Sequence, residues 1–304
     1  MDISAIIRFL LVIILSPFLL GVVNRTKAFF AGRQGAPLLQ SYYDIVKLLH
    51  KGAVYSRTTT WLFVAGPIVG ISAVVAAGLL MPFAGRPAFL SFDGDLVLFV
   101  YLLGLTRFFT VLAALDTGSS FTGMGASREV QFALFAEPAL FLSLAALARE
   151  TGQLSLSGIF SALTINSWRT SGPVLALIAA ALLIVFLAEN ARIPVDDPNT
   201  HLELTMIHEV MVLDHGGVEL AYIFSCAALK FWLLGSLLVG VVFPLRSALW
   251  GVDFLLFFLG MILLAMSIGV IESVFARLRL IKVPHFLVAG LSLAILALIF
   301  QMKS

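Results

Sequence analysis

The sequence predicts an all-α, polytopic membrane protein built as a single transmembrane domain over residues 1–304. Hydrophobic residues make up 61% of the chain and charged residues only 12%, whereas soluble domains carry about a quarter charged residues. The mean hydropathy of +1.06 agrees with this composition. Apolar stretches of about 20 residues, the length of a membrane-crossing helix, recur along the chain. Helices are expected because lipid leaves every backbone polar group to be paired internally.

About eight apolar stretches are candidate transmembrane helices. They lie at roughly 3–23, 61–82, 95–115, 128–148, 171–190, 217–243, 252–273 and 284–301. The third stretch contains the charged residue Arg107 and the last one is short, so these two fit a membrane-crossing helix less well than the others. An even number of spans places both termini on the same side of the membrane.

Basic residues predict the orientation. The loops after the first and the seventh span are rich in lysine and arginine, and such loops stay in the cytoplasm. Both termini are therefore expected outside. The basic residues of these two loops are Arg25, Lys27, Arg33, Lys47, Lys51, Arg57, Arg277, Arg279 and Lys282.

An amphipathic helix is predicted in the first cytoplasmic loop, opening at Pro37. Apolar residues recur there with helical spacing, and polar residues occupy the other faces. Such a helix suits the cytoplasmic membrane surface or a docking site for a partner subunit, and the sequence leaves both open. The apolar residues are Leu38, Leu39, Tyr42, Ile45, Val46 and Leu49.

The loop between spans five and six, from Glu189 to Gly217, is dense in acidic residues. Asp197 followed by Pro198 is typical of a helix start, and Gly216 with Gly217 is a typical stop. We therefore predict a helix over roughly 198–214.

Five ionisable residues fall inside spans: Arg107, Glu137, Glu189, Lys230 and Glu272. Each costs about 2.5–3.5 kcal/mol at a helix centre, and such residues often mark ion paths. The alternative is that they reach the interface or pair to hold helices together, which we favour for Arg107 and Glu272. For Glu137 and Lys230 we favour an ion path, and Pro138 is expected to kink the helix and admit water beside Glu137.

Several apparent motifs do not carry chemistry. The segment from Asp116 to Ser120 matches the aspartic-protease signature, but those enzymes need two such aspartates. His201, His208 and His215 are spaced by seven, a rise of about 10.5 Å per step on a helix, too far to share one zinc ion. A single cysteine, Cys226, excludes an iron–sulfur cluster held by this chain. We expect no cofactor and no metal site.

Three motifs in order resemble one known family. Residues 189–196 read Glu-Asn-Ala-Arg-Ile-Pro-Val-Asp, similar to the Glu-x-x-Arg-x-Pro-Phe-Asp signature of the quinone-site membrane subunit of respiratory complex I. Residues 32–37 with 44–48 resemble that family's first loop, and residues 125–129 with Glu137 its third-loop signature. The family includes the membrane subunits of group 4 nickel–iron hydrogenases, such as formate hydrogenlyase.

Departures from the complex I pattern favour the hydrogenase branch. Asn199 and His201 stand where complex I members have glutamates, while Glu203 is retained. The resemblance thus implies a non-catalytic membrane-anchor and proton- or ion-coupling subunit of a hydrogenase or hydrogenase-related complex. The alternatives are a quinone-binding complex I subunit and a stand-alone transporter, for which the expected inverted repeat is not found.

The resemblance also implies partners and a location. Expected partners are hydrogenase-like large and small subunits with iron–sulfur clusters, antiporter-like membrane subunits and the lipid bilayer, without nucleic acid, in a bacterial or archaeal cytoplasmic membrane. Candidate ion-path residues are Glu137, Glu189, Glu203, Glu209, Lys230, Glu272, Arg107, Asp116 and Glu129. Candidate partner-docking residues are Arg25, Lys27, Arg33, Lys47, Arg128, Arg192, Asp196 and Asp214.

Overall fold

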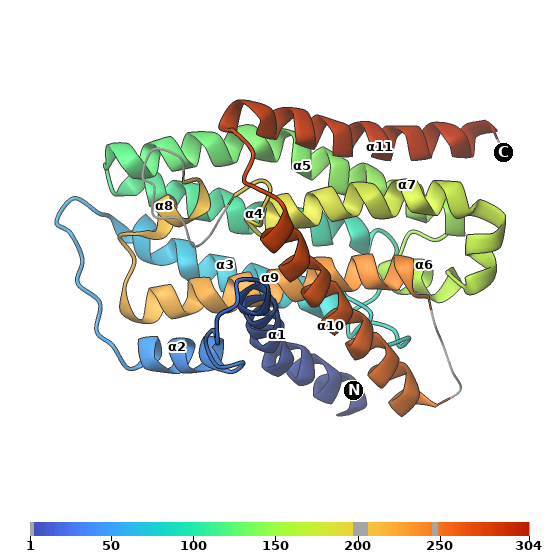
Figure 1. Cartoon of the computed structure of the whole chain (residues 1–304), viewed down its shortest axis with the longest axis horizontal. Helices are drawn as coiled ribbons and strands as arrows, with labels where there is room; N and C mark the ends of the chain where they lie inside the picture. The colour runs from blue at the N-terminus through green and yellow to red at the C-terminus, as the bar shows by residue number, and fades with distance from the viewer. Residues whose placement is uncertain (1–2, 197–205, 245–248, 304) are drawn as a thin grey trace.

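The computed structural model describes residues 3–196, 206–244 and 249–303, most of which are helical (Figure 1). Within these ranges eight helices are long and apolar enough to cross a membrane, which confirms the predicted all-α, polytopic fold. They are α1 (Ile3–Phe30), α3 (Trp61–Leu80), α4 (Asp95–Asp116), α5 (Ser120–Thr151), α7 (Ile165–Glu189), α9 (Gly217–Val242), α10 (Trp250–Val274) and α11 (Val283–Lys303).

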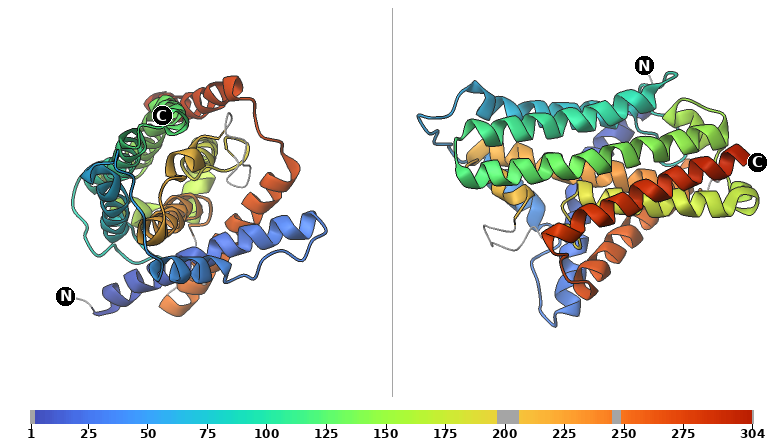
Figure 2. Two further views of the ribbon diagram at one scale, coloured as in Figure 1. Left: turned by 90° about the vertical axis from the view of Figure 1, so that its left-hand side faces the viewer. Right: turned by 90° about the horizontal axis from the view of Figure 1, so that it is seen from above.

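Helix α9 forms the centre of the bundle. Of its most apolar stretch 72% is buried, against 28–44% for the other seven long helices. Helices α3, α4, α5, α7, α9 and α11 follow the long axis of the molecule, whereas α1 and α10 cross it obliquely (Figures 1 and 2). Lipid provides no hydrophobic force between helices, so close packing and polar contacts must hold this arrangement.

Short helices mark the two ends of the bundle. Helices α2 (Gln40–Leu49) and α8 (His208–Val212) lie at one end, and α6 (Leu156–Ala162) lies at the other (Figure 1). Helix α2 confirms the predicted helix in the first loop. Its Tyr42 hydroxyl donates a hydrogen bond to the Ile14 carbonyl, while Tyr43, Val46 and Leu49 are exposed. That exposed apolar face suits either lipid or a partner protein.

Several helix boundaries and two short helices differ from the prediction. Helix α1 continues to Phe30 and α5 begins at Ser120, since a helix continues beyond the part that is apolar enough to detect from sequence. Helix α6 was not predicted. Of the helix expected over 198–214, the described part is confirmed only as α8 (His208–Val212), because residues 206–207 and 213–214 are not helical; residues 197–205 lie outside the described ranges.

Candidate functional site

Arg107 of α4 stands at the centre of a buried ion-pair cluster. Its side chain is 8% exposed and is surrounded by three carboxylates. The Nε atom lies 3.0 Å from Glu129 Oε1, and the two terminal nitrogens pair with Glu137 and Glu189. A buried cation needs such partners, because removing charge from water costs several kcal/mol.

Glu189 joins this cluster to α9. Its second oxygen lies 2.7 Å from the Lys230 amino group, so the carboxylate bridges Arg107 and Lys230. Glu189 is the last residue of α7, where the helix dipole disfavours a negative charge. The two cations offset both that dipole and the burial of the carboxylate.

The end of α7 explains the Glu-x-x-Arg spacing of the signature. Ala191 adopts a left-handed conformation with φ of +49°, and the Arg192 amide donates to the Leu187 carbonyl at 2.8 Å. This turn terminates the helix. It directs Glu189 toward Arg107 and Arg192 toward α10.

A second cluster surrounds Glu272 of α10. Glu272 lies 2.8 Å from the Lys27 amino group and 3.3 Å from an Arg192 nitrogen. The Arg192 guanidinium also sits over the Phe231 ring, 5.4 Å from its centroid, an arrangement that stabilises a buried cation. Neighbouring Asp196 pairs with Arg277 at 2.7 Å and accepts from the His208 amide at 3.1 Å.

The two clusters have opposite charge imbalances. Among the described residues, two cations face three carboxylates around Arg107, whereas two cations face one carboxylate around Glu272. With every group ionised, the first cluster carries one excess negative charge and the second one excess positive charge. The Arg107 cluster is therefore the part of this network that becomes neutral by taking up one proton.

A cavity of about 100 Å³ lies beside both clusters. Arg107, Glu189, Lys230 and Arg192 line it on one side, and α3 contributes an apolar wall around Pro67. A space of this size holds a few water molecules.

Glu137 reaches the outside of the bundle. Its side chain is 43% exposed although it pairs with Arg107, and it lines an open groove of about 720 Å³ between α4 and α5. The sequence predicts that Pro138 kinks the helix and admits water beside Glu137. Helix α5 is continuous through Pro138, and Glu137 faces the groove.

The remaining ion-path candidates lie around these clusters or apart from them. Arg107 and Glu272 are buried and paired, so neither reaches the interface. Asp116 instead accepts hydrogen bonds from the Thr60 amide and hydroxyl, at 2.6 and 2.8 Å, and so anchors the start of α3. Glu209 is half-buried on α8, and Glu203 lies outside the described residues.

The partner-docking candidates divide between surface and interior. Arg25, Arg33, Lys47 and Asp214 are exposed. Arg128 donates to the Met206 carbonyl at 2.9 Å. Lys27, Arg192 and Asp196 are engaged in the internal ion pairs described above.

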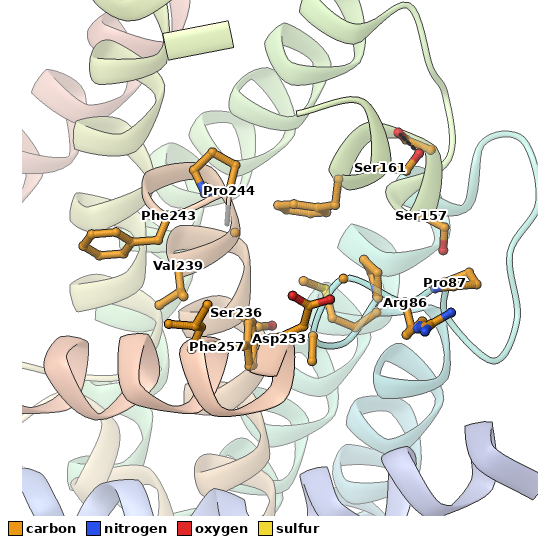
Figure 3. Close-up of a pocket in the computed structure, with 18 residues that line it drawn as sticks. Arg86, Pro87, Ser157, Ser161, Ser236, Val239, Phe243, Pro244, Asp253 and Phe257 are labelled. Atoms are coloured by element: carbon orange, nitrogen blue, oxygen red, sulfur yellow. Dashed lines mark hydrogen bonds between the residues drawn. The ribbon is translucent and has the colours of Figure 1, made fainter. Parts of the chain in front are cut away.

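A second cavity, about 340 Å³ in volume, lies at the opposite end of α9 (Figure 3). Asp253 of α10 points into it beside Ser236, and Arg86 and Ser157 lie across from them. Nearby Asp95, fully buried, accepts from the Leu156 amide at 2.7 Å and the Ser155 hydroxyl at 3.0 Å. The sequence did not single out Asp95 or Asp253, since single acids near loops give no pattern.

Three further residues at the α8 end were not predicted as site residues: Tyr55, Glu219 and His215, the last of which the sequence considered only as a zinc ligand. The Tyr55 hydroxyl donates to Glu219, and the His215 ring stacks on Phe63 with centroids 3.9 Å apart. Burial lowers the pKa of His215 to about 4, against a smaller opposing effect of Glu219 and Asp214. Burial likewise lowers the pKa of His208, so both histidines are neutral near pH 7. Within the described residues no group of side chains is arranged to hold a metal ion.

Comparison with known proteins identifies the family. A family model described as NADH dehydrogenase matches residues 2–302. The chain belongs to this family. The NADH dehydrogenase family thus accounts for the three sequence motifs, and the signature glutamate and arginine occupy the two buried clusters.

Relatives within the family span almost the whole chain. Formate hydrogenlyase subunit 4 of Escherichia coli is 31% identical over 97% of this chain and 96% of its own length. Hydrogenase-4 component C of the same organism is 30% identical over 98% and 95%. An NADH-quinone oxidoreductase subunit of Rubrobacter xylanophilus is 31% identical, but over only 55% of this chain and 51% of its own.

A solved structure has the same fold. A chain of the membrane-bound sulfane sulfur reductase, an archaeal respiratory membrane complex, superimposes with a TM-score of 0.81 and 23% identity, covering 97% of this chain and all of that one. With eight apolar helices and these relatives, the chain is a multi-pass membrane protein and a homologue of subunits of membrane complexes.

Proposed function

We propose that this chain is the membrane-anchor and ion-coupling subunit of a membrane-bound hydrogenase or hydrogenase-related complex. One observation carries the coupling role. Ion pairs run from Lys230 through Glu189 and Arg107 to Glu137, and so lead from the central cavity to a groove on the side of the bundle. Ionisable groups are rare inside membranes and mark ion paths when they form such series.

Electron transfer takes place in partner subunits, since the only cysteine is Cys226 and it is buried. Reduction of a centre in a partner docked at the α8 end adds negative charge near the cavity. A proton drawn toward that charge loads the Arg107 cluster, which has one carboxylate in excess. Return of the partner to its oxidised state releases the proton toward Glu137 and the neighbouring membrane protein.

The sequence relationships favour the hydrogenase branch over the complex I branch. The two hydrogenase-related proteins match over 97% and 98% of the chain, whereas the Rubrobacter protein matches over 55%. A quinone-binding role remains the alternative. Assays of the purified complex for quinone reduction and for hydrogen evolution distinguish this role from the proposed one.

The coupling role is tested on the intact complex, purified through a tag on this chain and reconstituted in liposomes. With reduced methyl viologen as electron donor, Glu137→Gln is expected to retain electron transfer but to lower ion uptake per electron at least about tenfold. Glu150→Gln, an equivalent change at the far end of α5, is the control. Unchanged uptake in Glu137→Gln, Glu189→Gln and Glu203→Gln would refute the proposal.

A further inference from the structure

A cluster of aromatic and ionisable side chains lies where the loop before α3 meets the start of α9. The Tyr55 hydroxyl donates to Glu219, although 164 residues separate the two. The Tyr55 ring meets the edge of Phe63, with centroids 6.5 Å apart. Phe63 in turn stacks on His215. We call Tyr55, Phe63, His215 and Glu219 the α9 entrance cluster.

Gly217 allows this cluster to form. Its φ is +54°, and a Cβ atom there would lie 2.8 Å from the Lys51 carbonyl oxygen and 2.9 Å from that of Gly52. Only glycine therefore permits residues 51–55 to approach the start of α9 so closely. Glu219, in the first turn of α9, is then held at the end of the helix where the dipole stabilises a negative charge.

Two polar atoms of the cluster are buried without a hydrogen-bond partner among the described residues. They are Oε2 of Glu219 and Nδ1 of His215, and each of these residues is 6% exposed. A buried polar atom without a hydrogen-bond partner destabilises the folded protein. Buried polar atoms without a hydrogen-bond partner require a functional or structural explanation.

The cluster joins the surface to the central cavity. At one side Tyr55 is 49% exposed. At the other side His215 lines the cavity that also contains Lys230, Glu189 and Arg107. The elements packed here contribute two acids near His215, Glu219 and the exposed Asp214. Groups that can carry protons thus lie between solvent and the central cavity.

We propose that Tyr55, Glu219 and His215 are the proton entrance of the central cavity, and that the ion moved by this protein is the proton. The inference rests on the proposed coupling function. Glu219 takes a proton from solvent at the Tyr55 side and gives it to one ring nitrogen of His215. The other ring nitrogen releases its proton to cavity water, so each step moves one proton and creates no new bond between heavy atoms.

The side chains favour a proton over sodium. A neutral imidazole carries protons by exchanging them between its two nitrogens, and the low pKa of His215 keeps the ring neutral near pH 7. Hard metal cations instead require several oxygen ligands. Stacking on Phe63 holds the imidazole at the cavity without using either nitrogen.

The test uses the reconstituted complex with reduced methyl viologen, measuring electron transfer, proton uptake and sodium uptake. Glu219→Gln and His215→Phe keep the size and the stacking but remove proton carriers. Each is expected to lower proton uptake per electron at least about tenfold while electron transfer by the partner subunits persists. Glu150→Gln and Tyr43→Phe, which change a carboxylate and a hydroxyl elsewhere, are expected to behave as wild type.

Milder variants distinguish a loss of proton transfer from a loss of folding. Tyr55→Phe removes one half-exposed hydroxyl and is expected to slow uptake, and Glu219→Asp, which retains the carboxylate, is expected to recover part of the rate. Wild-type uptake in Glu219→Gln, His215→Phe and Tyr55→Phe, or uptake of sodium alone, would overturn the entrance and leave the coupling function standing. Absence of any ion uptake by the wild-type complex would overturn both.

Discussion

At the scale of single residues, the central cluster depends on Arg107, because this one guanidinium contacts three carboxylates from two other helices. The positions of those carboxylates were visible in the sequence, but their convergence was not. Hydropathy marks a charge as costly and says nothing about its partner. The pairing comes from helices packed at the correct rotation.

Substitution of Arg107 is expected to destabilise the protein strongly. Arg107→Gln leaves Glu129 without its cation and Glu189 with Lys230 alone, and breaking a buried pair costs about 3–5 kcal/mol. The measurement is the thermal unfolding midpoint of the purified complex in detergent. Arg57→Gln, at an exposed arginine, is the control and is expected to leave the midpoint unchanged. Equal midpoints for Arg107→Gln and wild type would show that the ion-pair cluster does not stabilise the protein.

The pH dependence of stability tests His215. Its pKa in the folded protein is about 4, below the ordinary value of 6.5. Between these values the unfolded chain binds more protons, so stability rises with pH and is lost as pH falls from about 6.5 toward 4. His215→Phe is expected to reduce this loss. Unfolding midpoints at pH 5 and pH 7 check it, and an identical pH dependence in both proteins would contradict the assignment.

At the scale of elements, α8 shows how a motif predicted from sequence acquires a structural reason. Gly125, in the motif of residues 125–129, lies where α5 meets α8. A Cβ atom at Gly125 would lie 2.3 Å from Val210 Cγ1 and 2.8 Å from the Ile207 carbonyl oxygen. The glycine therefore permits the contact that places α8 and His208 beside the cavity.

Gly125→Ala is expected to displace α8, at a cost of about 1–3 kcal/mol from overpacking. Ion uptake per electron should fall with stability, because the wall of the cavity moves. Gly123→Ala on the same helix is the matched control, since a Cβ atom there meets nothing within 4 Å. Comparable losses of stability in both variants would contradict the packing role of Gly125, because alanine by itself favours a helix over glycine.

At the scale of the whole molecule, the groove between α4 and α5 exposes an ionisable side chain that this chain alone does not cover. A carboxylate that is 43% exposed on the side of a membrane bundle faces lipid unless another protein covers it, and ionisable groups rarely face lipid. Exposed Tyr101, Phe108 and Leu134 surround Glu137 in this groove. These exposed side chains suit contact with a neighbouring membrane protein.

Blocking this groove is expected to separate the subunits. Leu134→Trp adds bulk at a residue that is 67% exposed there, so other membrane subunits should co-purify with the tagged chain in lower yield. Leu263→Trp, on the exposed face of α10, is the control. Co-purification at the wild-type level in Leu134→Trp would show that the groove is not an interface.

The sequence by itself determined the number and positions of the spans, the helix in the first loop and the family. These follow from local properties: apolar length, periodicity and short motifs, which depend on residues close together in the chain. The tertiary structure alone decided which charges pair, that Glu137 reaches a lateral groove, and that Tyr55 meets Glu219 across 164 residues. Such contacts depend on how helices rotate and cross, and no local pattern encodes that geometry.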